Sequence, residues 1–460
     1  MGIPSYFAYL LRHHKHIVKR FEGGKTDNLY LDSNSIVYDV VRTLQYDPAD
    51  LEFDARLIQA VCDKLQFYLD LVNPSRVLIA FDGVPPMAKM KQQRERRYKS
   101  ILHAEAGPPS WNTVQITPGT KFMHALDAGL RAYFEPRAAK FAFFKLSTSE
   151  EPGEGEHKIF DLMRSTDHAG QSTLVYGLDS DLIILALNHL HHGDIRLLRE
   201  APAFHSKASG LQLLDVAALA SEIRAKIGNS KLQDYIFLTL FLGNDFMPHF
   251  PALNLRTTGF DTLIQTYKAT IKPKEHLCIG DEVQWPTVYR FIAALAAREA
   301  GNFKREYWSR DRVVDDAAVN TPLLRREVEM YINPLEPQWE SRYYSSLFQS
   351  ERHPVAPQAG GDFLAMLQWN MRYYTSGCPD WSLYYPYMYP PLLTDLARCR
   401  FRETSTPTKG PVAATELLEF VLPAEYAHLS LVPISGLALV LQNGRNCVVD
   451  DLRKIGDGVP

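Results

Sequence analysis

Seven acidic residues stand in five short motifs whose residue types suit metal-dependent chemistry. Each motif adjoins an apolar run: NLYLD, VLIAFDG, PGEGEHK, TLVYGLDSDL and FLTLFLGNDF. Carboxylates gathered in a partly dry site are unfavourable unless a cation balances them. Two Mg²⁺ ions would balance this charge, because Mg²⁺ prefers oxygen ligands. Two such ions close together can also drive in-line displacement at a phosphate. We therefore predict a catalytic metal site, which Mn²⁺ would also fit, formed by Asp32, Asp82, Glu154, Glu156, Asp179, Asp181 and Asp245.

Three of these motifs also have a purely structural interpretation. The two acids of PGEGEHK could simply enrich the first turn of a helix. In GLDSDL, Asp179 or Ser180 could cap the following helix, although capping explains only one of the two acids. The acid of GNDF could lie in a turn formed by Gly243 and Asn244. The five motifs taken together favour the metal site over these separate explanations.

A second group of residues shares one face of the helix predicted after Asp82. Lys89, Gln93, Arg96 and Arg97 are spaced i, i+4, i+7 and i+8. Arginine binds phosphate oxygens in a bidentate manner, and glutamine adds a neutral donor. A solvated helix face is the common alternative for such a charge run. Its position seven residues after Asp82 favours a pocket for a terminal phosphate beside the metal site.

Alternating strands and helices would position these residues. Short β-rich runs at 28–32, 76–81, 141–146, 173–177 and 194–199 alternate with helical stretches near 34–45, 50–72, 86–105, 119–135, 156–165 and 181–190. This order predicts an α/β fold, with a mostly parallel sheet flanked by helices and an additional helical C-terminal region. Asp32, Asp82 and Asp179 would then stand at the carboxyl ends of three strands, where open α/β sheets bind ligands.

The rest of the chain is predicted in less detail. Helical character dominates from about 211 to 270 and, with interruptions, from about 286 to 345. Residues 352–361, RHPVAPQAGG, are predicted to be a linker because of their prolines and glycines. The aromatic-rich segment 369–390 is expected to pack mostly in the core.

The amino-acid composition limits the classes of protein to which the chain can belong. The 460 residues are 46% hydrophobic and 22% charged, with a net charge of −3, so overall charge predicts neither nucleic-acid nor membrane binding. The five cysteines form no CxxC pair, which suits a reducing compartment. No run of eighteen apolar residues is present. We expect a soluble, intracellular protein without a membrane partner, and we favour the cytoplasm over the nucleus.

Eight sequence blocks resemble the ordered motifs of the Xrn family of 5′→3′ exoribonucleases: MGIPSYF, LYLDSNSIVYD, FDGVPPMAKMKQQRERR, ITPGTKFM, PGEGEHKI, YGLDSDLI, FLGNDFMPHFP and WSLYYPYMYPP. The resemblance is strong over 1–270 and returns at 362–422. It implies a nuclease domain like those of PIN and flap nucleases at 1–270 and a helical connecting region at 271–350. A reduced second conserved region at 362–422 would pack on the nuclease domain, and 423–460 would form a C-terminal tail.

The resemblance also implies an activity. Family members are Mg²⁺-dependent enzymes that remove nucleotides one at a time from single-stranded RNA with a 5′-monophosphate, excluding capped and triphosphate ends. The seven acids correspond to the family's metal cluster. Lys89, Gln93, Arg96 and Arg97 correspond to its 5′-phosphate pocket. The chain looks like a compact variant with a role in RNA decay, and its protein partners are not predicted.

Two departures from the family pattern concern base stacking. The residue six after the first Asp is usually a histidine, and here it is Tyr38. The usual second tryptophan of the late block is Leu383, which leaves Trp381 as the nearest candidate partner for a terminal base. The residues alone also allow two other functions: a flap-type DNA nuclease and a non-catalytic RNA-binding protein. The phosphate pocket argues against the first, and the complete acid set argues against the second.

Overall fold

The structure, a computed structural model, describes residues 2–105, 110–201, 210–228, 231–311, 327–403, 407–408 and 410–434. Within these residues, seven strands form one sheet in the order β1-β7-β6-β5-β2-β3-β4. The strands are β1 Val18–Arg20, β2 Asn28–Asp32, β3 Arg76–Ala80, β4 Phe143–Ser147, β5 Ser172–Tyr176, β6 Asp194–Glu200 and β7 Leu211–Asp215.

The sheet is mostly parallel. β6, β5, β2, β3 and β4 pair in parallel, whereas β7 joins β6 and β1 joins β7 in antiparallel register. This confirms the predicted α/β class. The prediction of helical structure from residue 211 was wrong for Leu211–Asp215, which form β7. Leucine and glutamine favour helices, but pairing with β6 and β1 on either side overrides that preference.

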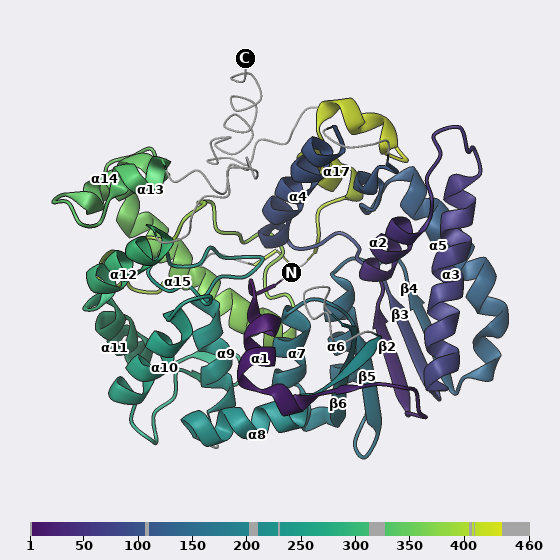
Figure 1. The fold of residues 1–460 in the computed structure, drawn as a ribbon, viewed down its shortest axis with the longest axis horizontal. Helices are drawn as coiled ribbons and strands as arrows, with labels where there is room; N and C mark the ends of the chain where they lie inside the picture. The colour runs from purple at the N-terminus through teal and green to yellow at the C-terminus, as the bar shows by residue number, and fades with distance from the viewer. Residues whose placement is uncertain are drawn as a thin grey trace.

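Helices cover both faces of the sheet (Figure 1). On one side lie α2, α3 and α5, and on the other lie α1, α6, α7 and α8. The strands alternate between the two cores: Leu31 points into the first, and its neighbour Tyr30 points into the second. The helices up to this point are α1 Tyr6–His13, α2 Asn34–Thr43, α3 Phe53–Val72, α4 Met87–Glu105, α5 Lys121–Phe134, α6 Gly155–Ser165, α7 Asp181–Asn188 and α8 Val216–Ile227.

A helical region completes the described chain. It contains α9 Leu232–Leu240, α10 Gly259–Thr270, α11 Trp285–Ala296, α12 Glu299–Asp311, α13 Glu327–Ile332, α14 Trp339–Leu347, α15 Arg352–Ser376, α16 Leu393–Leu396 and α17 Ala414–Val421, with the hairpin β8 Cys278–Ile279 and β9 Glu282–Val283. The long helix α15 packs against α7 and α9, and α17 packs against α4. Of the predicted tail at 423–460, residues 435–460 lie outside the described residues.

The linker predicted at 352–361 is wrong, because these residues are the first part of α15. Pro354 lies in the first turn, where backbone amides have no intrahelical partner, so it removes no hydrogen bond there. Pro357 lies inside the helix, and tertiary packing compensates for it. Ala356 and Ala359 are buried, and the missing side chain of Gly360 allows Cys399 to approach closely. None of the described helices has the length and apolar character needed to cross a membrane.

Candidate metal centre and phosphate-binding site

Three of the predicted acids stand at the carboxyl ends of adjacent parallel strands. Asp32 is the last residue of β2, Asp82 follows the end of β3, and Asp179 follows the end of β5. β2 lies between β3 and β5 in the sheet. The expectation that the sheet itself would bring these distant acids together is confirmed.

Asp32 and Asp82 meet at the first residue of α6, Gly155. The Gly155 amide donates a hydrogen bond of 2.7 Å to Asp82 Oδ1. A Cβ atom on Gly155 would lie 2.6 Å from Asp32 Oδ1, so only glycine allows that carboxylate to lie there. Asn34 fixes the other side of Asp82: its Nδ2 donates to Asp82 Oδ2 at 2.8 Å, and its Oδ1 accepts from the Asp82 amide at 3.0 Å. Asn34 was not among the predicted site residues.

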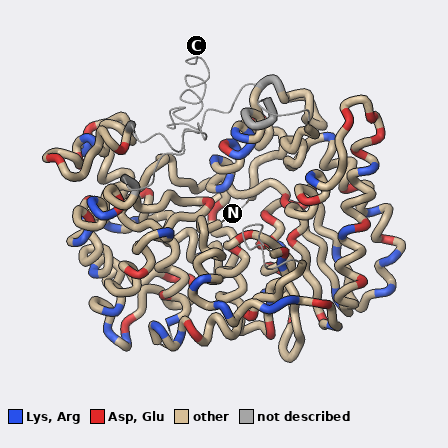
Figure 2. Tube along the Cα trace, in the orientation of Figure 1, with Lys and Arg blue, Asp and Glu red and all other residues tan. Residues whose placement is uncertain are grey.

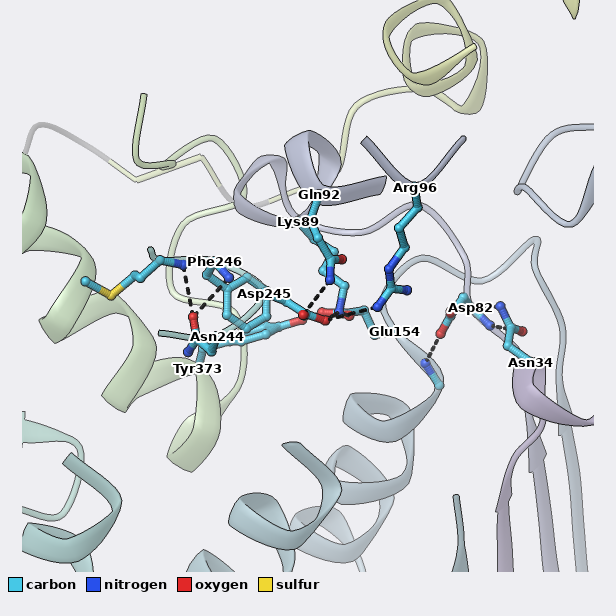
Figure 3. Close-up of polar contacts among 12 residues, drawn as sticks. Asn34, Asp82, Lys89, Gln92, Arg96, Glu154, Asn244, Asp245, Phe246 and Tyr373 are labelled. Atoms are coloured by element: carbon cyan, nitrogen blue, oxygen red, sulfur yellow. Dashed lines mark hydrogen bonds and ion pairs between the residues drawn. The ribbon is translucent and has the colours of Figure 1, made fainter. Parts of the chain in front are cut away.

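The Lys89 side chain joins two further acids from different elements (Figure 3). Its Nζ lies 2.5 Å from Glu154 Oε2 and 2.5 Å from Asp245 Oδ2. All three residues are buried. Burial alone would lower the pKa of Lys89, but Asp245 and Glu154 raise it well above its usual value. Burial would likewise raise the pKa of Asp245, but Lys89 and other positive charges lower it to about 2.

A turn before Phe246 presents Asp245 to Lys89. Asn244 Oδ1 accepts hydrogen bonds of 3.0 Å from the amides of Phe246 and Met247. Its Nδ2 donates to Asn370 Oδ1 of α15 at 2.8 Å. The structural interpretation of this motif as a turn is therefore correct, but the turn and the acidic site coexist.

Glu156 and Asp181 lie deeper in the same region. They are 4% and 1% exposed, and among the described residues Glu156 Oε2 and both carboxylate oxygens of Asp181 have no hydrogen-bond partner. Burial, together with Asp181, raises the pKa of Glu156 well above its usual value. Burial and Asp245 raise the pKa of Asp181 to about 7. Ser180, the N-cap of α7, makes no side-chain capping hydrogen bond, so the capping alternative does not hold for Ser180.

These orphaned acceptor oxygens test whether the site fits a metal ion. Buried carboxylate oxygens without donors require either protons or a hard cation, and an oxygen-only donor set suits Mg²⁺ or Mn²⁺. The donor chemistry therefore fits a divalent metal. Within the described residues, no three His, Cys, Asp or Glu side chains already surround a common point as a metal site does. Lys89 supplies a positive charge to two of the acids, Glu154 and Asp245.

Tyr373 of α15 was missed as a site residue. Its hydroxyl donates a hydrogen bond of 2.8 Å to Glu154 Oε1. The ring is held between His157, with a centroid distance of 3.7 Å, and Trp369, at 4.5 Å. The expectation that the aromatic segment packs in the core is confirmed for these rings, but packing alone did not reveal this bond to an acid. An i, i+4 aromatic pair in the sequence was the available signal.

Arg199 of β6 is a second buried cation close to the acids. Its Nη2 donates to the Leu178 carbonyl at 2.6 Å, and its guanidinium lies 3.6 Å from the ring centre of Phe7. Burial lowers its pKa to about 10, while the charge of Asp179 acts in the opposite direction. The arginine therefore ties the turn that carries Asp179 to helix α1.

The four predicted phosphate-binding residues all lie on α4, where basic positions gather (Figure 2). Lys89 faces the acids, and Arg96 Nη2 lies 3.7 Å from Asp245 Oδ2. Gln93 is buried, and its Oε1 has no hydrogen-bond partner in the part of the chain that the structure describes. Arg97 turns toward the protein, where Nε donates to Thr117 Oγ1 at 2.8 Å and Nη2 to the Ile116 carbonyl at 3.0 Å. Gln92, which was not among the predicted residues, donates to Asp245 Oδ1.

The two residues predicted to stack on a base flank α4. Trp381 is half-buried, and its carbonyl accepts a 3.0 Å hydrogen bond from the Met87 amide at the start of α4. Tyr38, on α2, is half-buried and lies near Arg97 of α4. Their stacking role stays a prediction.

Comparison with known proteins decides the family. Residues 1–201 match the family described as XRN 5'-3' exonuclease N-terminus. Residues 228–333 and 325–433 match the family described as Xrn1 helical domain. The chain belongs to the Xrn family. The Xrn matches cover the strands that carry the strand-end acids and the helical region that contains Tyr373, but not β7.

Individual relatives agree with this assignment. The chain is 30% identical over 399 residues to 5'-3' exoribonuclease 2 of Eremothecium gossypii, covering 67% of this chain and 42% of that protein. It is 27% identical to human 5'-3' exoribonuclease 1, covering 93% and 31%. The Saccharomyces cerevisiae 5'-3' exoribonuclease 1 shows 24% identity, with 93% and 40% covered. The chain thus spans less than half the length of these relatives.

One solved structure similar to the chain is a bacteriophage T5 flap endonuclease in complex with DNA and metal ions. It has 11% sequence identity and a TM-score of 0.30, and the match covers 61% of this chain and 88% of the endonuclease.

Replacing Tyr373 with Phe keeps the ring stack but removes the donor to Glu154. We expect the metal-free protein to lose about 1–3 kcal/mol of unfolding free energy, because a buried carboxylate oxygen loses its partner. Calorimetric titration should also show weaker Mn²⁺ binding. The control Tyr385→Phe removes a buried hydroxyl that donates to the Tyr389 carbonyl, so it should change stability alone. Equal Mn²⁺ affinity in both variants and the wild type would contradict the proposed role of Tyr373.

The raised pKa of Asp181 predicts a pH-dependent effect of Asp181→Asn. With a folded pKa of about 7 and a lower unfolded value, Asp181 stabilises the metal-free fold at low pH. That contribution is lost as pH rises through 7. The neutral asparagine avoids this loss, so the variant should gain on the wild type between pH 5 and pH 7, by about 1.4 kcal/mol per unit at most.

Urea unfolding in EDTA at several pH values measures this difference. The exposed Asp70→Asn should show no such trend, and saturating Mn²⁺ at pH 8 should reverse the order of Asp181→Asn and wild type. A difference that is constant with pH would refute the assignment.

Proposed function

We propose that this chain is a 5′→3′ exoribonuclease that degrades single-stranded RNA bearing a 5′-monophosphate to 5′-mononucleotides. The observation that carries the proposal is the position of the basic helix α4: its Lys89 contacts Glu154 and Asp245 beside the sheet edge at which Asp32, Asp82 and Asp179 follow or end parallel strands. Membership of the Xrn family and the names of the relatives support the same activity.

The seven acids would hold two Mg²⁺ ions, which Mn²⁺ would replace. When bound, such ions stabilise the negative charge that develops at the scissile phosphate and favour ionisation of the attacking water. The protein contributes the fixed carboxylates: Asn34 and the Gly155 amide orient Asp82, and Tyr373 orients Glu154. Lys89 would balance part of the remaining charge.

The basic face of α4 would select the RNA end. Arg96 is 32% exposed on its side chain and lies above Asp245, so it is the best placed of the four residues to reach a phosphate. Gln93 adds a donor from the same face, whereas Arg97 supports the face through Thr117. A terminal phosphate held there leaves only the first phosphodiester bond near the acids. A cap or triphosphate would exceed the space for one phosphate, and each cut would leave a new 5′-phosphate end.

Single-stranded RNA suits the remaining features. Tyr38 lies near Arg97 of α4, and the Trp381 carbonyl contacts the start of the same helix. Stacking on such aromatic rings would hold bases without reading their identity. Recognition through phosphate charge and stacking would make degradation largely independent of sequence.

A time course on end-labelled RNA tests the proposal. With Mg²⁺, RNA with a 5′-monophosphate should yield mononucleotides from its 5′ end, whereas 5′-hydroxyl, triphosphate and capped RNA should persist. Matched 5′-phosphorylated DNA should be degraded more slowly. Arg96→Ala should reduce the preference for 5′-phosphate over 5′-hydroxyl ends by at least about tenfold, because a charge-assisted bond is lost.

Arg131→Ala is the matched control, since this arginine on α5 is 42% exposed and pairs with Glu135. The control should keep the wild-type end preference. Degradation from the 3′ end, equal or faster degradation of DNA, or an end preference unchanged by Arg96→Ala would each contradict a part of the proposal.

A further inference from the structure

A cavity of about 690 Å³ lies at the opposite part of α15 from the acidic site. One wall is the first half of α15, including Ala356, Pro357 and Ala365, and the other is the segment after α16. Tyr373 on the same helix contacts Glu154. With a rise of about 1.5 Å per residue, the cavity begins about 12 Å from Tyr373 along the helix and extends to about 30 Å. It is therefore separate from the site described above.

Positive charge dominates the lining of this cavity. Four arginines line it, Arg352, Arg398, Arg400 and Arg402, against two aspartates, Asp362 and Asp395. This is a formal excess of two positive charges in a chain whose net charge is −3. Such a local excess attracts anions regardless of the overall balance.

One aspartate is already neutralised within the protein. Arg352 donates to both oxygens of Asp395, with Nη2 to Oδ1 at 3.0 Å and Nε to Oδ2 at 3.0 Å. The Tyr344 hydroxyl donates to Asp395 Oδ2 at 2.7 Å. Arg398 also lies near this carboxylate, with its Nη1 3.9 Å from Asp395 Oδ1. Because Arg352 and Tyr344 already hold Asp395 at hydrogen-bond distance, Arg400 and Arg402 keep their charge for a ligand and Arg398 keeps most of its own.

The remaining arginines alternate along an anchored segment, RCRFR at 398–402. Phe401 stacks on Trp285 of α11 at 4.5 Å, and its amide donates to the Tyr289 hydroxyl at 2.8 Å. Cys399 and Phe401 are partly buried, whereas the three arginines are exposed. The Arg400 guanidinium is also held 4.5 Å from the Tyr289 ring centre. Binding would therefore order few groups, which favours affinity.

The other groups that line the cavity suit the ribose and the base of a nucleotide. Asp362 is half-buried and has no hydrogen-bond or ion-pair partner among the described residues, which leaves a carboxylate to accept from ribose hydroxyls. Ala356, Pro357 and Ala365 offer an apolar surface for a base. The volume lies in the usual range for small-ligand sites.

We propose that this cavity is a second nucleotide-binding site, which binds a nucleoside monophosphate unit through its phosphate, either free or within an RNA strand. The arginines of the 398–402 segment hold the phosphate, and Asp362 accepts from the ribose. This proposal does not depend on nuclease activity.

Calorimetric titration of the full chain in EDTA tests it without turnover. The probes are adenosine 5′-monophosphate, adenosine, inorganic phosphate and a short 5′-hydroxyl RNA. The test variant is Arg398→Gln with Arg402→Gln, both exposed. The control is Arg42→Gln with Arg196→Gln, which removes the same charge at exposed, ion-paired positions outside the cavity. Arg96→Gln reports on the acidic site.

We expect the test variant to bind adenosine 5′-monophosphate, the RNA or both at least tenfold more weakly, about 1.4 kcal/mol. Which of the two is weakened identifies the source of the ligand. The control should bind like the wild type, Arg96→Gln should keep the binding event that the test variant loses, and Asp362→Asn should weaken the mononucleotide but not inorganic phosphate. The proposal fails if the test variant binds both probes normally, if adenosine or phosphate binds as well as the mononucleotide, or if Arg96→Gln alone removes binding.

Discussion

The electrostatic problem of gathering like charges in a buried region governs the rest of the structure. Asp32, Glu154, Glu156, Asp181 and Asp245 are all at most 9% exposed. Burial and mutual repulsion raise the pKa of Asp32 and Glu156 well above the usual values, whereas Asp245, beside Lys89, stays low. Acids placed in this way oppose folding unless protons, protein cations or metal ions balance them. A region that opposes stability in this manner is typical of a site kept for chemistry.

The sheet and the helical region each contribute residues to the acidic site. The sheet places Asp32, Asp82 and Asp179 at one edge, and glycine at the start of α6 lets two of them approach. Helix α15, which is more than 170 residues further along the chain than α6, contributes Tyr373 to Glu154 and Asn370 to the turn before Asp245. The acidic site therefore depends on contacts between the region that matches the Xrn exonuclease N-terminus and the region that matches the Xrn1 helical domain.

The sequence was sufficient for the features with strong local signals. Strand and helix periodicity located the parallel strands, and strand ends predicted where Asp32, Asp82 and Asp179 would lie. Features decided by distant packing were not predictable. Leu211–Asp215 became a strand through its partners, and residues 352–361 became helical because Ala356, Ala359 and Gly360 pack against other elements. Asn34 and Gln92 carry no signal that separates them from ordinary core or surface residues until the fold brings them to an acid. The i, i+4 pair of Trp369 and Tyr373 indicates aromatic packing but does not by itself indicate a contact with an acid.

The most direct test of the account is a manganese titration followed by electron paramagnetic resonance, which counts bound ions without any substrate. Wild-type protein should bind two Mn²⁺ ions, and the double variant Asp179→Ala with Asp181→Ala should lose at least one of them while remaining folded. Wild-type protein that binds no Mn²⁺, or a double variant that binds as many ions as the wild type, would contradict the claim that these acids form a metal centre.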